Sequence, residues 1–141
     1  MPRHLGIVGF KSLGEVGVSF PRLTVLFGPN AAGKSNLLDA IQALSCIVTS
    51  RTLSDALSEP IRGCPVEAFA FPPGGLAALL SKKESRFKLQ ADFNIGKDHF
   101  RYWTEIAIQP ESGSLSVTDE YLWIDTQVYP YSLNSRWRTE R

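Results

Sequence analysis

The sequence predicts an α/β fold in which a buried strand, a glycine-rich loop and a helix are followed by an antiparallel meander of strands. In the first half, the hydrophobic pattern changes from a short apolar run to a helical repeat across the glycine-rich loop. The second half instead alternates polar and apolar residues over long stretches. Such alternation is typical of antiparallel strands with one solvated face.

The glycine-rich loop at residues 28–35 has the form G-x-x-x-x-G-K-[ST], with the sequence Gly-Pro-Asn-Ala-Ala-Gly-Lys-Ser. Residues 23–27 before it are mostly apolar and partly β-branched, so they predict a short strand buried on both faces. After the loop, apolar residues recur at helical spacing and predict an amphipathic helix that ends near Ser50. This apolar stripe consists of Leu37, Ile41, Leu44 and Val48.

Each part of the loop suits a nucleotide polyphosphate. Its glycines allow a tight backbone whose amide N–H groups point at phosphate oxygens. Lys34 adds a charge that reaches the β- and γ-phosphates, and Ser35 offers a hydroxyl to Mg²⁺. We therefore predict ATP and Mg²⁺ as cofactors, Lys34 and Ser35 as the catalytic residues and Ser35 as the metal ligand, with ATP and GTP not distinguished. The predicted phosphate contacts are Gly28, Pro29, Asn30, Ala31, Ala32, Gly33, Lys34 and Ser35.

Composition sets only broad bounds. The 141 residues suit one domain or one lobe of a larger one, and 43% hydrophobic residues allow a packed core. A net charge of +1, from 15 basic and 14 acidic residues, neither indicates nor excludes a nucleic-acid partner. The two cysteines lack a metal-ligand spacing. Without a signal peptide or an apolar run near about eighteen residues, we expect a soluble cytoplasmic protein with no membrane segment.

The meander is predicted from residue 86 onward. A strand at 86–95 alternates polar and apolar residues throughout and is followed by a turn at 96–98. The next strand places Phe100, Tyr102, Ile106 and Ile108 on one face. A third strand spans 115–124, with a break near Asp119. Before the meander, we expect strands at 4–10 and 16–20 joined by a turn at 11–14, a short helix at 52–59, a loop at 60–75 and a helical turn at 76–80.

At this point the chain resembles the ABC-type ATPase heads of the RecF, SMC and OLD-like group, which includes predicted AAA-family ATPases. Residues 5–13, with their Phe-Lys-Ser sequence, are similar to the opening strand of that group. Residues 23–41 share its Gly-Pro-Asn loop start and the Ser-Asn after the lysine. The likeness is looser over residues 71–76 and the meander that ends at 120–122.

In such heads the nucleotide lies between two copies, and one copy supplies a Walker B strand while its partner supplies a signature helix. The sequence contains no Leu-Ser-Gly-Gly-Gln-like signature, and no run of four apolar residues ends in Asp-Glu. We therefore expect an incomplete P-loop NTPase N-terminal lobe of the ABC-ATPase type. Its expected parts are strands, P-loop and helix at 1–50, loop and short helices at 51–85, the meander at 86–127 and a tail at 128–141.

The resemblance implies an ATP-binding lobe that acts in DNA maintenance or phage defence. It implies hydrolysis only with the missing Walker B and signature segments, so this chain alone should be inactive or very weak. A second head, as a homodimer, is the implied partner, and DNA is not excluded. By the same likeness, Asn36 lies near the α-phosphate, and Lys11 and Ser12 lie beside the base and ribose. Ordinary surface roles remain open for these three residues.

Two other functions remain open. Residues 121–125 are similar to a Walker B strand, and a self-contained P-loop phosphotransferase would use Asp125 to hold Mg²⁺. However, Thr126 replaces the acidic residue that should follow, so we favour the end of a surface strand for Asp125. Gln127 is a lesser candidate for the glutamine-loop residue. The other alternative is a regulator that binds nucleotide without catalysis.

Overall fold

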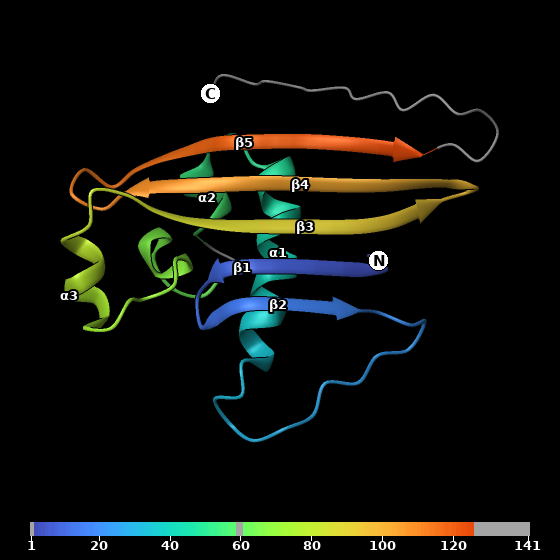
Figure 1. Cartoon of the computed structure of the whole chain (residues 1–141), viewed down its shortest axis with the longest axis horizontal. Helices are drawn as coiled ribbons and strands as arrows, with labels where there is room; N and C mark the ends of the chain where they lie inside the picture. Colours follow the sequence, from blue (N-terminus) through green and yellow to red (C-terminus); the bar gives the residue numbers. More distant parts are fainter. Residues whose placement is uncertain (1, 59–60, 126–141) are drawn as a thin grey trace.

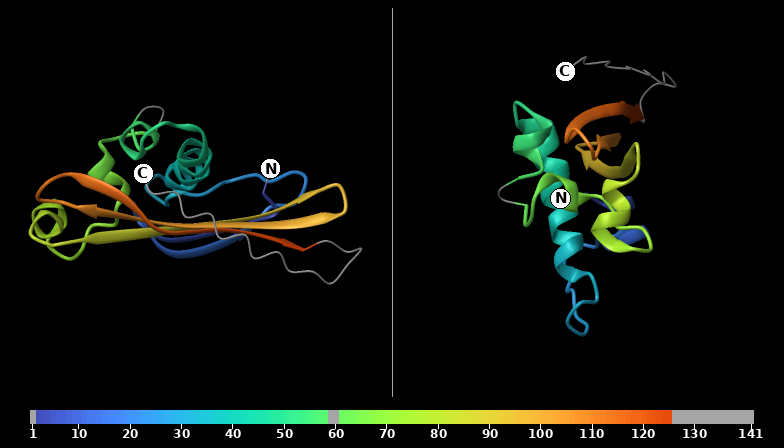
Figure 2. Two further views of the ribbon diagram at one scale, coloured as in Figure 1. Left: turned by 90° about the horizontal axis from the view of Figure 1, so that it is seen from above. Right: turned by 90° about the vertical axis from the view of Figure 1, so that its left-hand side faces the viewer.

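One antiparallel sheet and one long helix dominate the computed structural model, which describes residues 2–58 and 61–125. The five strands lie in the order β2-β1-β3-β4-β5 (Figure 1). Helices α1 and α2 lie against one face of the sheet, as Figure 2 shows. The strands are β1 (His4–Phe10), β2 (Leu13–Ser19), β3 (Ser85–Ile95), β4 (Asp98–Gln109) and β5 (Ser114–Asp125). The helices are α1 (Lys34–Thr49), α2 (Leu53–Ala56), the 3₁₀ turn η1 (Pro65–Ala68) and α3 (Gly75–Leu80).

The core lies between α1 and the sheet. The alternation of β3 turns Phe87, Leu89 and Ala91 toward the helix, and all three are buried. Helix α1 faces them with small residues, because Ala40 and Ala43 are both fully buried. Small side chains let the helix backbone approach the sheet closely, which fixes the position of α1. The rings of Phe10, Phe69 and Phe87 extend this core, with centroid distances of 5.2 Å and 5.0 Å to Phe87.

The predicted meander is confirmed as β3, β4 and β5, and the hairpin of β1 and β2 joins the same sheet through β1 and β3. Strand β5 is continuous, and the irregularity expected near Asp119 is a register shift. Glu105 pairs with Asp119, but Ile106 pairs with Val117, so Thr118 is the extra residue. The Thr118 hydroxyl donates to the Glu105 carboxylate at 2.8 Å, which supports the bulge.

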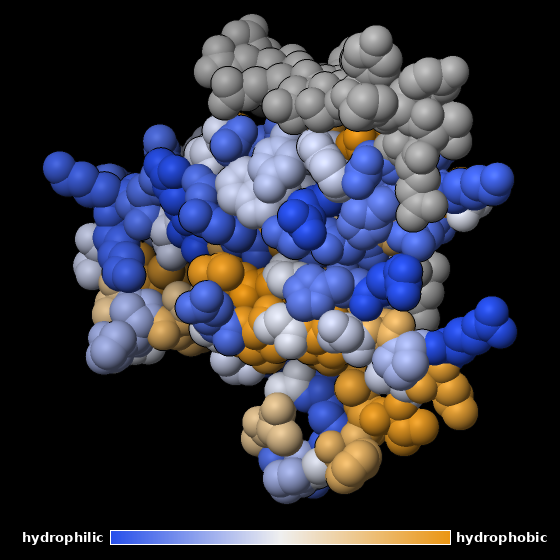
Figure 3. All heavy atoms as spheres, turned by 45° about the vertical axis from the view of Figure 1, so that its right-hand side comes forward, coloured by the Kyte–Doolittle hydropathy of each residue, from blue (hydrophilic) through white to orange (hydrophobic). Residues whose placement is uncertain are grey.

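The buried strand predicted at residues 23–27 is wrong for this chain. These residues form no strand, and Leu23, Val25 and Phe27 are 82%, 70% and 90% exposed. They lie in the loop that leads from β2 to α1, and this loop carries hydrophobic surface below the sheet (Figure 3). No described strand lies beside them, so their backbone groups have no ladder to join. The predicted P-loop topology therefore lacks its first element here.

Smaller differences concern element bounds. Strand β2 begins at Leu13, three residues before the predicted start, because Phe10 pairs directly with Leu13 across a tight turn. The helix predicted at 52–59 is only one turn long in the described residues, and the Thr52 hydroxyl caps it by accepting from the Asp55 amide at 3.1 Å. The predicted tail at 128–141 lies outside the described residues. Within the described ranges, no helix has the length and apolar character needed to span a membrane.

Two phenylalanines provide a test of this core. Phe87→Ala should lower the free energy of unfolding by about 3–5 kcal/mol, because it empties the centre of the aromatic cluster. Phe27→Ala should change it by less than about 0.5 kcal/mol, because the Phe27 side chain is 90% exposed. Urea unfolding followed by circular dichroism measures both values. A large loss for Phe27→Ala would show that residues 23–27 are buried after all.

Candidate functional site

The glycine-rich loop joins directly to the first turn of α1. Gly33 is the residue before the helix, with φ at 87°, and no side chain caps the helix there. A side chain at this position would be strained by that angle and would also crowd Leu13, whose Cδ2 lies 3.2 Å from the place of a Cβ. Ala31 also has a positive φ of 65°. The glycine is therefore required by both backbone angle and close packing.

The start of α1 presents unused hydrogen-bond donors. The first bond of the helix runs from the Leu37 amide to the Gly33 carbonyl at 2.9 Å. Within the described ranges, no hydrogen bond is recorded for the amides of Lys34, Ser35 or Asn36. Such orphan donors, together with the positive end of the helix dipole, favour an anion. The chemistry of these donors fits a phosphate group.

The Lys34 side chain folds back over its own loop. Its ammonium donates to the Gly28 carbonyl at 2.8 Å and to the Pro29 carbonyl at 2.7 Å. An ammonium has three N–H donors, so one stays available for a ligand. Ser35 is exposed, with its hydroxyl at the same helix start. The structure thus brings a cation, a hydroxyl and free amides together, as a phosphate–magnesium site requires.

The turn between β1 and β2 lies against this helix start. The Asn36 amide nitrogen donates to the Ser12 hydroxyl at 2.7 Å. A Cβ at Gly33 would lie 3.7 Å from the same hydroxyl. The three residues chosen by family likeness, Lys11, Ser12 and Asn36, therefore lie beside the loop. Their contacts with a nucleotide stay a prediction.

A buried carboxylate missed in the sequence links this turn to a third segment. Asp39, only 8% exposed, accepts from the Lys11 ammonium at 2.5 Å and from the Arg62 guanidinium at 2.7 Å. Burial raises the pKa of Asp39, but hydrogen bonds from Arg62 and Lys11 outweigh it, so the pKa lies below its usual value. The only sequence signal was an acidic residue inside the buried stripe of a helix. It indicates a charged partner but not which one.

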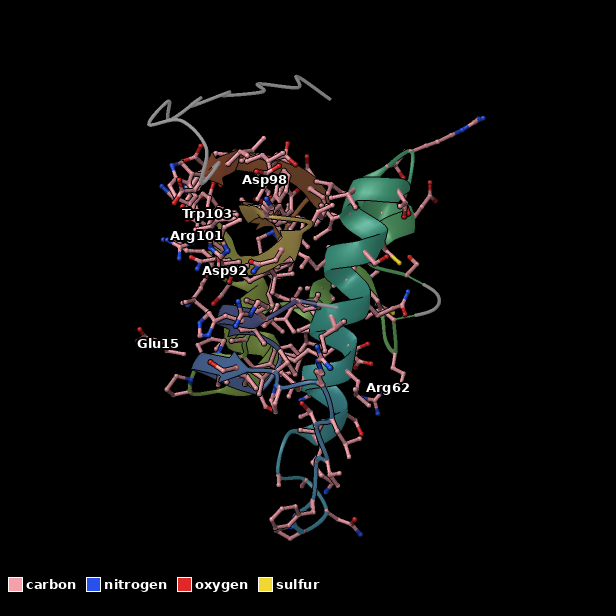
Figure 4. The ribbon with its side chains drawn as sticks, turned by 90° about the vertical axis from the view of Figure 1, so that its right-hand side faces the viewer. Glu15, Arg62, Asp92, Asp98, Arg101 and Trp103 are labelled. Atoms are coloured by element: carbon pink, nitrogen blue, oxygen red, sulfur yellow. The ribbon has the colours of Figure 1, made fainter. Side chains whose placement is uncertain are left out.

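A pocket of about 610 Å³ lies beside the start of α1 and is bordered by both cations that bind Asp39. Figure 4 shows Arg62 beside the half of α1 that follows the loop. Phe71, 47% exposed, adds an aromatic ring to the wall. The lining residues are Lys11, Ser12, Asn36, Arg62, Gly63, Glu67, Phe69 and Phe71.

Asp125 lies elsewhere. It is the exposed last residue of β5, an edge strand at the opposite side of the sheet from β2. It pairs with His99 in an antiparallel ladder. Among the described residues, no group of three or more His, Cys, Asp or Glu is placed to hold a metal ion. This arrangement favours the surface strand end over a Walker B role. Thr126 and Gln127 lie outside the described residues.

A known protein family matches most of this chain. Residues 23–139 match the family described as "AAA domain, putative AbiEii toxin, Type IV TA system". The chain belongs to this AAA-domain family. The match begins at Leu23, so it includes the exposed loop, α1 and strands β3 to β5, whereas β1 and β2 precede it.

This AAA domain also has relatives among characterised proteins. It is 30% identical over 95 residues to the DNA replication and repair protein RecF of Paenarthrobacter aurescens, which covers 67% of this chain and 22% of the relative. It is 42% identical over 53 residues to RecF of Lactobacillus acidophilus, which covers 37% and 14%. It is 31% identical over 100 residues to the chromosome partition protein Smc of Bacillus subtilis, which covers 70% and 7%. These matches confirm the resemblance to the ATPase heads of the RecF, SMC and OLD-like group.

The lowered pKa of Asp39 gives this AAA domain a pH dependence. The folded state holds the proton of Asp39 less tightly than the unfolded state does. The contribution of Asp39 to the free energy of unfolding is therefore complete above about pH 4 and is lost as the pH falls further. We expect Asp39→Asn to reduce the fall in unfolding free energy between pH 6 and pH 3, measured by urea unfolding at about those values. Asp125→Asn, which removes an exposed carboxylate, is the control. If the unfolding free energy of Asp39→Asn fell with pH as steeply as that of the wild type, the lowered pKa of Asp39 would be contradicted.

Proposed function

We propose that this chain is the ATP-binding N-terminal lobe of an ATPase head and that residues 28–35 hold the nucleotide phosphates with Mg²⁺. The observation that carries the proposal is the cluster of unpaired amides, Lys34 and Ser35 at the start of α1, in a member of an AAA-domain family. In this proposal the amides of residues 30–35 cradle the phosphate oxygens. Lys34 exchanges a loop carbonyl for a phosphate oxygen, and Ser35 offers its hydroxyl to Mg²⁺. The ion, when bound, neutralises charge on the β- and γ-phosphates.

The pocket beside the loop is proposed to take the base and ribose. It adjoins the phosphate donors through Ser12 and Asn36, and about 610 Å³ is room enough for a nucleoside. Lys11 and Arg62 supply donors, Glu67 an acceptor, and Phe71 an apolar wall. This mixture of donors and acceptors suits the edges of a purine but does not separate adenine from guanine.

The exposed segment at 23–27 supports the proposal that this chain is one lobe of a larger head. Its apolar residues have no partner strand among the described residues, and the matched region spans less than a quarter of the RecF relative from Paenarthrobacter aurescens. We propose that a second lobe supplies the neighbouring strand, the acidic pair and a signature segment, and that hydrolysis requires two such heads together.

A role in DNA maintenance is supported by the relatives named for replication, repair and chromosome partition. Phage defence is the other role that the resemblance implies. The sheet face away from α1 offers DNA little electrostatic attraction, because Arg86, Lys88 and Arg101 each form an ion pair with a carboxylate. We therefore propose DNA as a partner of the complete head and not of this sheet face.

The phosphate site is tested by calorimetry. Mg·ATP added to the folded chain should release or absorb measurable heat, and Lys34→Ala should lose this signal because the ammonium faces the phosphates. Lys97→Ala is the matched control, since Lys97 lies exposed in the turn between β3 and β4. A folded wild-type chain without any binding heat would refute the proposal.

Hydrolysis is tested in a steady-state assay of phosphate release. The isolated chain should turn over ATP at no more than a background rate, because the proposed acidic pair and signature segment belong to the second lobe. Asp125→Ala should leave nucleotide binding unchanged. Robust turnover that depends on Lys34, or loss of Mg²⁺-dependent binding in Asp125→Ala, would favour the self-contained phosphotransferase instead.

A further inference from the structure

Asp39 joins three segments that are distant in the sequence. It lies on α1 four residues after Ser35, which places both side chains on neighbouring turns of one helix face. Its carboxylate accepts from Lys11 in the β1–β2 turn and from Arg62 in the loop after α2. The Lys11 ammonium also donates to the Arg62 carbonyl at 2.7 Å, so the two cationic segments are tied to each other. Asn36, one turn earlier on α1, makes a weaker parallel link, since it donates to Ser12 at 2.7 Å and faces Arg62 Nη2 at 3.5 Å.

The contact to Lys11 holds a disfavoured turn. Lys11 has a φ of 50°, in the left-handed region that residues with a side chain rarely adopt. Its side chain is only 10% exposed and ends on Asp39. This turn also places the Ser12 hydroxyl against Asn36 and Gly33, at the edge of the phosphate loop. Asp39 thereby helps to hold the turn that carries Ser12, together with the bond from the Lys11 amide to the Ala68 carbonyl at 2.9 Å.

The contact to Arg62 aims a guanidinium into the pocket. Its Nε and Nη2 face the two oxygens of Asp39, and Nη2 also approaches Asn36 Oδ1 at 3.5 Å. Within the described ranges, no hydrogen bond is recorded for Nη1, which carries two N–H donors. The side chain is 60% exposed and lines the pocket. The guanidinium is thus held on one edge and available to a ligand on the other.

We infer that Asp39 is a positioning residue for the nucleoside end of the site, through its hold on Lys11 and Arg62. This inference rests on the proposed function, because it assumes that a nucleotide binds with its base in the pocket. Its side-chain hydrogen bonds run to Lys11 and Arg62, and among the described residues none runs to residues 28–35. Its removal should therefore weaken the recognition of the nucleoside and spare the recognition of the phosphates.

The experiment compares two probes, Mg·ATP and Mg·tripolyphosphate, which lacks a nucleoside. For Asp39→Asn we expect the Kd of Mg·ATP to rise about tenfold, and that of Mg·tripolyphosphate to stay within about twofold of the wild type. Asp92→Asn is the matched control. Asp92 is equally buried at 8% and pairs with Arg101 at 2.8 Å and 2.9 Å, but it lies on the face of the sheet away from α1 (Figure 4). The control should leave both Kd values unchanged.

Each outcome decides a different point. Unchanged ATP binding in Asp39→Asn, or an equal loss for both probes, would overturn the positioning role and leave the proposed function in place. A wild-type chain that binds neither probe would overturn the proposed function itself, and the positioning role with it. Should Asp39→Asn not fold, Lys11→Met with Arg62→Gln removes the partners instead and must give the same selective loss. Where all variants fold, the loss of ATP affinity in the variant that combines Asp39→Asn, Lys11→Met and Arg62→Gln must be smaller than the sum of the separate losses.

Discussion

The packing of α1 against the sheet is the constraint on which the candidate site depends. The loop itself contributes little, because residues 28–32 are exposed and their side chains pack on no core. The position of its donors follows from the helix that they begin. That helix is fixed by the burial of Leu37, Ala40 and Ala43, and the two alanines bring its backbone close to the strands. A hydrophobic contact thus sets the geometry of a polar site.

Electrostatics provide a second attachment on the same helix. Asp39 is a single carboxylate shared by two cations, so the cluster carries a net positive charge at the pocket wall. Removing either cation leaves the buried carboxylate partly compensated, whereas removing the carboxylate leaves two cations facing each other. The cluster therefore tolerates change at Arg62, which is largely exposed, better than change at Asp39. Because Asp39 is the shared partner of both cations, one residue holds both the β1–β2 turn and the segment that carries Arg62.

The sequence predicted what local periodicity determines. The repeat of α1 and the alternation of β3 both follow from neighbours a few residues apart, and both are present in the structure. The strand predicted at residues 23–27 was wrong because a strand depends on a partner that is distant in the sequence, and no described strand provides one. Arg62 was missed for a related reason. It meets Asp39 across 23 residues of chain, and no pattern of spacing encodes that contact.

The exposed segment also bears on how the site becomes competent. Leu23, Val25 and Phe27 leave apolar surface in water, where burying each side chain would contribute roughly 1.5–3 kcal/mol. A strand that covered them would stabilise the chain by several such contributions. It would also fix the residues just before Gly28, so that the loop would be held from both sides and not only by α1. The Lys34 ammonium is bound to the carbonyls of Gly28 and Pro29. A loop backbone held from both sides would move less readily with this ammonium when the ammonium turns toward a phosphate. In the proposed head, the pairing of residues 23–27 with a neighbouring strand and the turning of Lys34 toward phosphate are consequently coupled, because the same short segment takes part in both.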